Sequence, residues 1–262
     1  MISTIATMWQ NAATGGDPRI QHMPLMQSPA VVHVIVLSYI IFVKKIGPRI
    51  MQHRPPFSLK SLLLAYNFSM MLYNFAIFYA GGTFGWWNGY SLRCQPLDTS
   101  YTRNGIGMAY TAYAFMFSKI IELLDTVFFI LRKKDNQVTG LHVWHHSFMV
   151  ISYYWGIKYF PGGHGSFVGF VNSFIHVIMY GYYFLSALGP GIQKHLWWKK
   201  YLTSLQMIQF TAIFIHSMQL LFTSCNVPNS IIIYTMFNTL VFLILFRDFF
   251  VKAYHRTQQK SK

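Results

Sequence analysis

Seven apolar stretches divide this chain of 262 residues, and each approaches the length of a helix that crosses a membrane. A bilayer core about 30 Å thick requires about 20 apolar residues per helix. The stretches are Met23–Val43, Leu62–Tyr79, Ile106–Leu131, Leu141–Ile157, Phe167–Leu188, Leu202–Phe222 and Ser230–Phe250. This pattern predicts an all-α membrane protein: an N-terminal segment over residues 1–22, one seven-helix domain over 23–250 and a basic tail over 251–262. Met1–Gln27 lacks the charged start and apolar core of a cleaved signal peptide, so we expect insertion to depend on the internal spans.

Charged residues make up only 10% of the chain, whereas ordinary soluble domains contain about 25%. The net charge of +15 would suit nucleic acid, but the cations lie in short polar gaps between apolar stretches, as membrane orientation signals do. No segment is long enough for a soluble nucleic-acid-binding domain. Five tryptophans at the ends of apolar runs are typical of interfacial belts: Trp86, Trp87, Trp155, Trp197 and Trp198. The expected partner is therefore the lipid bilayer, and nucleic acid is excluded.

With seven spans, alternate gaps fall on opposite sides of the membrane, and the cations separate accordingly. One side holds Lys44, Lys45, Arg49, Arg54, Lys60, Arg132, Lys133, Lys134, Lys194, Lys199, Lys200, Arg247, Lys252, Arg256, Lys260 and Lys262. The other side holds Arg19, Arg93, Arg103 and Lys158, while Lys119 lies inside a span. The positive-inside rule then predicts a cytosolic C-terminus and a non-cytosolic N-terminus. An even number of spans would scramble this separation.

The same sorting places Cys94 and Cys225, the two cysteines of the chain, on the non-cytosolic side. Two cysteines are too few for a disulfide scaffold or a zinc site. If that side is oxidising, as in the endoplasmic reticulum lumen, a bridge between them is chemically allowed. Two unrelated free thiols remain the alternative.

His142, His145 and His146 follow the spacing H-x-x-H-H within the fourth apolar stretch. On a helix, positions i, i+3 and i+4 share one face, so the three imidazoles are expected to form a cluster one turn long. Each ring nitrogen removed from water without a partner costs roughly 1–3 kcal/mol, which argues against three such rings as ordinary core residues. Imidazole can serve as a base, a nucleophile or a metal ligand, and the cluster therefore indicates chemistry.

The third stretch carries three ionisable residues, Lys119, Glu122 and Asp125, although each costs about 2.5–3.5 kcal/mol at bilayer depth. Lys119 and Glu122 are one turn apart and can form an ion pair that holds the helix bundle together. Alternatively, Glu122 and Asp125 orient the imidazoles of the fourth stretch, because a carboxylate that accepts a hydrogen bond from one ring nitrogen fixes the tautomer. The short connection between the two stretches predicts an antiparallel pair of helices.

Two further stretches carry polar side chains at helical spacing. Asn172, His176, Met179, Tyr180 and Tyr183 form a stripe on the fifth, and Gln206 and Gln209 lie on the sixth. Buried amides often hold transmembrane helices together. Four consecutive helices with polar faces instead indicate a shared internal cavity.

Three classes of function are compatible with the cluster. A di-iron desaturase or hydroxylase needs about eight metal ligands, usually from three histidine boxes. The chain offers only one such box plus His176, so the number of ligands falls short. Counting alone leaves open a single zinc on His142, His146 and His176, but we expect no metal and no cofactor. A transporter or receptor with a polar central site would explain the tyrosines and glutamines, but not three histidines beside two carboxylates. Acyl transfer fits best, because a neutral imidazole can attack a thioester and give an acyl-imidazole that remains activated.

The ordered motifs resemble those of the elongases of very-long-chain fatty acids, over nearly the whole chain from Gly47 to Tyr254. The matching residues are Gly47-Pro48 with Met51, Arg54, Pro56 and Phe57; Lys119, Glu122, Asp125 and Thr126 in K-x-x-E-x-x-D-T; the L-H-x-x-H-H box Leu141–His146; Asn172 and His176 with Met179, Tyr180, Tyr182 and Tyr183; and Tyr201-Leu202-Thr203 with Gln206, Gln209 and Phe210.

The resemblance implies seven transmembrane helices, with spans two to seven forming a barrel of two inverted three-helix units around an acyl tunnel. It also implies residence in the endoplasmic reticulum membrane and condensation of an acyl-CoA with malonyl-CoA to 3-ketoacyl-CoA, with release of CO2 and CoA. By the family pattern His145 carries the acyl group, and His142, His146, His176 and Asn172 activate it and manage protons and enolate charge.

Six cations at the cytosolic mouth would suit the phosphates of CoA: Arg54, Arg132, Lys133, Lys134, Lys199 and Lys200. Tyr180 is expected to stabilise the enolate together with His176 and Asn172. Further partners would be the other enzymes of the elongation cycle and a second copy of the chain.

Overall fold

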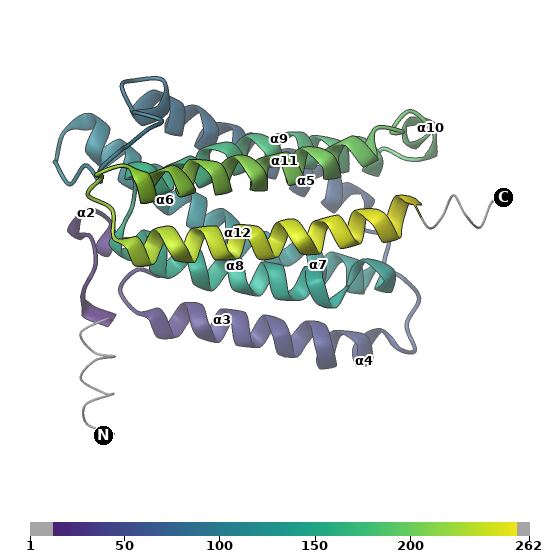
Figure 1. The fold of residues 1–262 in the computed structure, drawn as a ribbon. Coiled ribbons are helices and arrows are strands. Elements are labelled where there is room, and N and C mark those ends of the chain that lie inside the picture. Colours follow the sequence, from purple (N-terminus) through teal and green to yellow (C-terminus); the bar gives the residue numbers. More distant parts are fainter. Residues whose placement is uncertain (1–12, 256–262) are drawn as a thin grey trace. The chain divides into compact units, whose positions relative to one another are not determined.

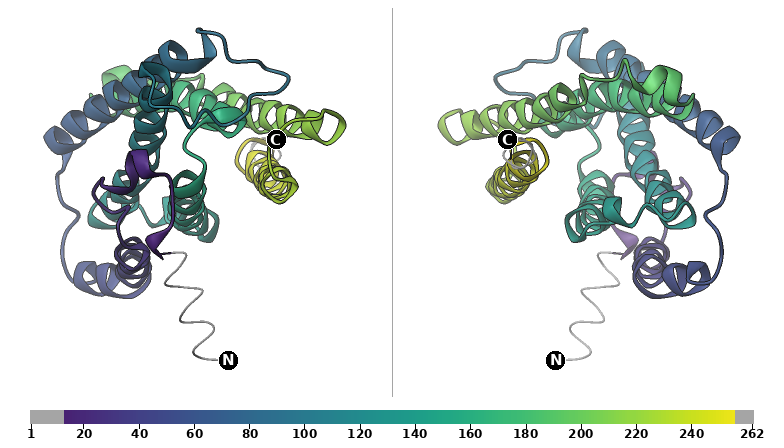
Figure 2. Two further views of the ribbon diagram at one scale, coloured as in Figure 1. Left: turned by 90° about the vertical axis from the view of Figure 1, so that its left-hand side faces the viewer. Right: turned by 90° about the vertical axis from the view of Figure 1, so that its right-hand side faces the viewer.

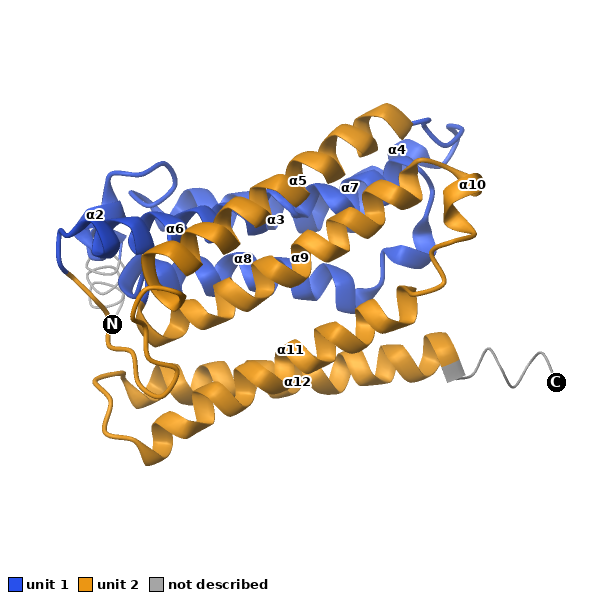
Figure 3. Ribbon diagram, turned by 90° about the horizontal axis from the view of Figure 1, so that it is seen from above, with its two compact units in different colours: residues 1–59, 100–162 blue, residues 60–99, 163–262 orange. Residues whose placement is uncertain are grey.

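The computed structural model describes residues 13–255, and in this range the chain forms helices and connecting loops without β-strands (Figure 1). Residues 1–12 and 256–262, which include the predicted tail cations Arg256, Lys260 and Lys262, lie outside the described part. The chain divides into two compact units, each built from two separate segments (Figure 3). Of the described residues, unit 1 comprises 13–59 and 100–162, and unit 2 comprises 60–99 and 163–255.

Unit 1 contains helices from both of its chain segments. They are α2 (Pro18–Gln21), α3 (Pro29–Ile41), the π-helical turn η1 (Phe42–Ile46), α4 (Gly47–Met51), α6 (Arg103–Ile121), α7 (Leu123–Leu131), the 3-10 turn η3 (Asp135–Gln137) and α8 (Gly140–Tyr159). Helix α8 packs against both α3 and α6, so the predicted antiparallel pairing of the third and fourth stretches is confirmed.

Unit 2 contains the remaining long apolar helices. They are α5 (Lys60–Gly81), the π-helical turn η2 (Gly82–Trp86), the 3-10 turn η4 (Gly163–Gly165), α9 (Ser166–Ala187), α10 (Pro190–Gln193), α11 (Lys199–Met218), the 3-10 turn η5 (Gln219–Phe222), α12 (Asn229–Phe250) and η6 (Val251–His255). Helix α5 packs along α9, and α11 runs beside α12 (Figure 2). Between α5 and α9, the ring of Phe78 stacks on Phe170 with centroids 4.7 Å apart.

Five helical segments in the described range are long and apolar enough to cross a membrane, which makes this a multi-pass membrane protein. They are Pro29–Met51, Lys60–Trp86, Gly163–Ala187, Lys199–Phe222 and Asn229–Tyr254. The third and fourth predicted stretches are also helical but fall outside this set. The third is broken at Glu122 and carries three ionisable side chains, and the fourth carries three histidines. The seven-span count therefore remains a prediction.

The first span begins later than the sequence pattern suggested, at Pro29 instead of Met23. Proline suits the first helical position, where its missing N–H would be unsatisfied in any case, and Ser28 precedes it with extended backbone. The chain before it turns sharply, with Leu25 at φ 70°. Apolar composition alone could not locate this start, because Leu25 and Met26 belong to the turn.

The segment before α3 packs into unit 1 through a buried ion pair. Arg19 donates to Asp17 at 2.6 Å, and also to the backbone oxygen of Gly105 at 3.0 Å. The Asp17 N–H donates to the Lys158 oxygen at 2.7 Å, and the Lys158 ammonium donates to the Met26 oxygen at 2.8 Å. These contacts fix residues 17–26 against the ends of α6 and α8.

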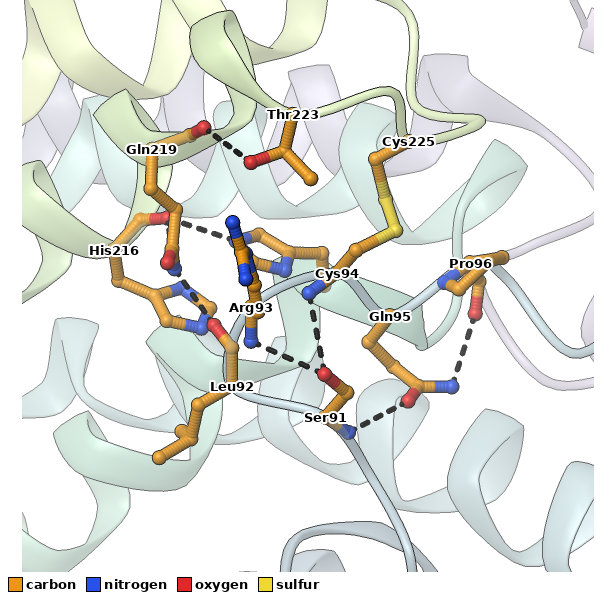
Figure 4. The surroundings of a disulfide bond; sticks show 11 residues. Ser91, Leu92, Arg93, Cys94, Gln95, Pro96, His216, Gln219, Thr223 and Cys225 are labelled. Atoms are coloured by element: carbon orange, nitrogen blue, oxygen red, sulfur yellow. Dashed lines mark hydrogen bonds between the residues drawn. A yellow bond between two sulfur atoms is a disulfide. The ribbon is translucent and has the colours of Figure 1, made fainter.

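In unit 2, Cys94 and Cys225 form a disulfide that joins the loop after η2 to the loop before α12 (Figure 4). Gln219 donates to the Leu92 oxygen at 2.6 Å and to the His216 oxygen at 2.9 Å. These hydrogen bonds join the loop that carries Cys94 to the end of α11, next to the disulfide.

Replacing Cys94 and Cys225 together by serine is expected to lower the free energy of unfolding by about 2–4 kcal/mol, because the bond closes a loop spanning 131 positions. Thermal unfolding of the purified protein in detergent would measure the loss. Alkylation without reductant is expected to label neither cysteine in the parent protein, and labelling of both would contradict the bridge.

Gly163 occupies a position that a side chain cannot share. Its φ is +58°, and an added Cβ would lie 2.9 Å from the backbone nitrogen of Leu97. Gly163→Ala is therefore expected to destabilise unit 2 by about 1–2 kcal/mol from the left-handed backbone alone. The control is Gly165→Ala, since a Cβ there meets open space. Equal melting temperatures for the two variants would contradict the expectation.

Candidate active site

The three box histidines lie together on the first two turns of α8, as their spacing predicts. The rings of His142 and His146 have centroids 4.4 Å apart, and His146 meets His145 edge-on at 5.6 Å. Helix α8 begins at this point because Thr139 caps it, its hydroxyl accepting the His142 N–H at 3.1 Å. All three rings are half-buried. The cap therefore starts the helix just before the box, and the i, i+3, i+4 spacing brings the imidazoles onto one turn.

A hydroxyl from the neighbouring helix contacts the first of these rings. His142 Nε2 lies 3.0 Å from Thr126 Oγ1 on α7, and Thr126 Oγ1 lies 2.7 Å from the hydroxyl of Tyr39 on α3. Thr126 is completely buried, and Tyr39 is only 6% exposed. The sequence interpretation assigned the orientation of the imidazoles to Glu122 and Asp125. At His142 the structure shows a hydrogen bond with the Thr126 hydroxyl, a group to which the sequence interpretation gave no role.

The junction of α6 and α7 carries a buried ion pair beside this network. Lys119 donates to Glu122 Oε1 at 2.7 Å, and each side chain is no more than 4% exposed. The Lys119 ammonium also lies 4.7 Å from the centroid of the Phe115 ring. The ion pair that the i, i+3 spacing predicted therefore forms within unit 1. Asp125 is buried on α7 one residue before Thr126.

Four of the six cations expected to bind CoA occur on two loops of unit 1 that are hydrogen-bonded together. The Phe57 N–H donates to the backbone oxygen of Leu131 at 3.0 Å, and the Lys133 ammonium donates to the backbone oxygen of Gln52 at 3.4 Å. These bonds hold the loop carrying Arg54 against the loop that carries Arg132, Lys133 and Lys134. The other two cations, Lys199 and Lys200, begin α11 in unit 2 and are exposed.

The second set of predicted polar residues forms a stripe within unit 2. On α9, His176 and Tyr180 have ring centroids 6.0 Å apart, and Tyr180 meets Tyr183 edge-on at 5.9 Å. Gln206 of α11 lies 3.8 Å from the sulfur of Met179. Asn172 is half-buried on α9, and Gln209 is buried on α11. The polar faces of α9 and α11 therefore meet, as interhelical amides commonly do.

Within residues 13–255, no group of three or more histidine, cysteine, aspartate or glutamate side chains is arranged to hold a metal ion. Of the zinc ligands that counting left open, His142 and His146 belong to unit 1 and His176 belongs to unit 2.

The structure adds two residues to the set chosen from sequence. Thr126 was matched as part of a motif but given no role, and Tyr39 was not singled out at all. A tyrosine in an apolar span can pack like any other aromatic residue, so only its position opposite Thr126 identifies it. The signal for Thr126 was its place directly after Asp125 in K-x-x-E-x-x-D-T.

The chain is similar to known proteins over most of its length. Residues 24–262 match the model of the ELO family, described as GNS1/SUR4. "Very long chain fatty acid elongase 1" of Mus musculus is 46% identical over 256 residues, which cover 97% of this chain and 91% of the mouse protein. A very long chain fatty acid elongase of Aedes aegypti is 45% identical over 246 residues, covering 94% of this chain and 69% of the mosquito protein. This chain therefore belongs to the ELO family of very long chain fatty acid elongases.

Proposed function

We propose that this elongase family member condenses a long-chain acyl-CoA with malonyl-CoA to give 3-ketoacyl-CoA, CO2 and CoA. The observation that supports this most directly is the cluster of three imidazoles on α8, with His142 and His146 4.4 Å apart. Among common side chains, a neutral imidazole combines nucleophilicity with the ability to leave again, so its acyl derivative can pass the acyl group onward.

In the first step, an imidazole nitrogen of His145 attacks the thioester carbonyl of the acyl-CoA. The new bond joins nitrogen to the acyl carbon, the carbon–sulfur bond breaks, and CoA leaves as a thiol with the imidazole proton. His142 and His146 are the neighbouring groups that would relay that proton. This step needs no metal and no cofactor.

In the second step, malonyl-CoA loses CO2 and its electron pair remains as an enolate. The enolate carbon attacks the acyl-imidazole, the carbon–carbon bond forms, and the bond to His145 breaks. The released imidazole takes up one proton, so the overall reaction consumes one proton. Enolate charge requires donors in a water-poor site. Asn172, His176 and Tyr180 are the donors that we assign to it, with Tyr183, Gln206 and Gln209 supporting them.

The phosphates of CoA would be bound by cations. Arg54, Arg132, Lys133 and Lys134 lie on two loops of unit 1 that are tied by hydrogen bonds, and guanidinium groups match phosphate geometry. Lys199 and Lys200 at the start of α11 complete the proposed set. Lys119, Glu122 and Asp125 are assigned a supporting role beside the histidines.

We further propose that the protein resides in the endoplasmic reticulum membrane with seven spans, of which the last six form a barrel around an acyl tunnel. The C-terminus would be cytosolic and the N-terminus lumenal. The disulfide between Cys94 and Cys225 supports an oxidising environment for the loops that carry it. Other enzymes of the elongation cycle, and a second copy of this chain, are the partners that we expect.

The test is a condensation assay with the purified protein, radiolabelled malonyl-CoA and a series of acyl-CoA chain lengths. Labelled 3-ketoacyl-CoA, formed with equal amounts of CO2 and free CoA, is the expected result. Absence of product at every chain length would overturn the proposal and would favour a transporter or receptor role.

A further inference from the structure

We propose that Tyr39 and Thr126 are positioning residues that act through His142 and hold its imidazole in a single tautomer. The inference rests on the proposed function, because it assigns how the histidine cluster is kept ready for acyl transfer. It adds a residue from the first span, α3, which lies outside every motif that identified the cluster.

Three side chains from three helices of unit 1 form a continuous hydrogen-bonded chain. Tyr39 of α3 lies 2.7 Å from Thr126 of α7, and the same Thr126 oxygen lies 3.0 Å from His142 Nε2 of α8. The Thr126 hydroxyl is buried, so its partners are these neighbours and not bulk water. The His142 ring in turn lies beside His146, and His146 lies beside His145.

The chemistry of the two hydroxyls sets the direction of this chain. A threonine hydroxyl has one hydrogen, so it can donate to Tyr39 or to His142 but not to both. A phenol is the stronger acid of the two, with a pKa of about 10 in water, and is therefore the better donor. In the proposed hydrogen-bonded chain, Tyr39 therefore donates to Thr126, and Thr126 donates to His142 Nε2.

An imidazole nitrogen that accepts a hydrogen bond carries no hydrogen. His142 is thereby held neutral with its hydrogen on Nδ1, because the tautomer of a histidine follows from the hydrogen bond that its other nitrogen makes. Its ring orientation next to His146 is fixed at the same time. Without Tyr39, the Thr126 hydroxyl can rotate and accept instead, and both tautomers of His142 become populated.

The structure provides a matched control for this proposal. Tyr154 of α8 also belongs to unit 1 and is fully buried, but its hydroxyl has no hydrogen-bond partner among the described residues. Tyr39→Phe and Tyr154→Phe therefore each remove a hydroxyl from a buried ring of unit 1. Only the first variant interrupts the chain to His142.

Steady-state kinetics of condensation provide the first measurement. We expect Tyr39→Phe to lower kcat roughly tenfold with KM for both substrates unchanged, as loss of one hydrogen bond in the site would. Thr126→Val should lower kcat at least as much, and Thr126→Ser, which keeps the hydroxyl, should restore it. The kcat of the double variant Tyr39→Phe/Thr126→Val should equal that of Thr126→Val alone, because effects of residues linked in one series of hydrogen bonds do not add. Tyr154→Phe should behave as the parent protein.

The second measurement reports the tautomer directly and does not depend on activity. In protein labelled with 15N-histidine, the ring-nitrogen resonances that disappear in His142→Gln are those of His142. They should show one tautomer, protonated at Nδ1, in the parent protein and in Tyr154→Phe, and a mixture of tautomers in Tyr39→Phe.

A parent protein that condenses its substrates while Tyr39→Phe keeps full kcat and a single His142 tautomer would overturn this inference and leave the proposed function intact. The same outcome with a lowered melting temperature would mean that the bond between α3 and α7 is only structural, which also overturns it. A parent protein without condensation activity would instead refute the proposed function, whatever the spectra show.

Discussion

His145→Ala is expected to abolish condensation, lowering the rate of 3-ketoacyl-CoA formation by at least about a thousandfold, as removal of a nucleophile does in other covalent mechanisms. His145 is half-buried on α8, so we expect the variant to fold and insert normally. The measurement is the labelled malonyl-CoA assay, with circular dichroism and melting temperature to show that the variant is folded. His195→Ala is the control, because His195 is an exposed histidine outside the cluster.

The same variant identifies the residue that carries the acyl group. Incubated with radiolabelled acyl-CoA and no malonyl-CoA, the parent protein should retain label in a form released by hydroxylamine, and it should release free CoA. His145→Ala should retain none. A variant that still forms the labelled intermediate, or that condenses at the parent rate, would remove His145 as the acyl carrier.

Lys119→Met is expected to lower the free energy of unfolding by about 3–5 kcal/mol, because it leaves the Glu122 carboxylate buried without its cation. The Lys119 ammonium and the Glu122 carboxylate are 2.7 Å apart, and both side chains are almost completely buried. Thermal unfolding in detergent and resistance to proteolysis would report the loss. The double variant Lys119→Met/Glu122→Gln should recover most of it, since no buried charge remains.

The chain supplies a matched exposed ion pair for comparison. The Lys252 ammonium and the Asp248 carboxylate are 2.6 Å apart on neighbouring turns, but more than half of each side chain is exposed. Lys252→Met should change stability by no more than about 1 kcal/mol, because water screens an exposed pair. Equal losses of unfolding free energy for Lys119→Met and Lys252→Met would contradict the expectation that burial makes the Lys119–Glu122 pair more important for stability.

Much of the secondary structure follows from the sequence, because long apolar stretches in lipid can satisfy their backbone groups as helices. Helices α5, α9 and α12 begin and end within about two residues of the predicted stretches. The third stretch was predicted as one helix, but the chain interrupts it at Glu122. Hydropathy could not show this break, since apolar residues continue on both sides of the buried carboxylate.

The box spacing likewise determined that His142, His145 and His146 share one helix turn, because i, i+3 and i+4 positions face the same way on any α-helix. The i, i+3 spacing of Lys119 and Glu122 likewise predicted an ion pair, because it places the two side chains on one face of the helix. These are local geometric consequences, and the structure shows each of them.

Which groups meet these residues from other helices was decided only by the tertiary structure. Tyr39 is 87 positions from Thr126 in the chain, yet their hydroxyls lie 2.7 Å apart. The disulfide spans 131 positions, and the sequence could show only that both cysteines lay on one predicted side of the membrane. The physical reason is that helical periodicity assigns each side chain a face, whereas the packing of whole helices selects which faces come together.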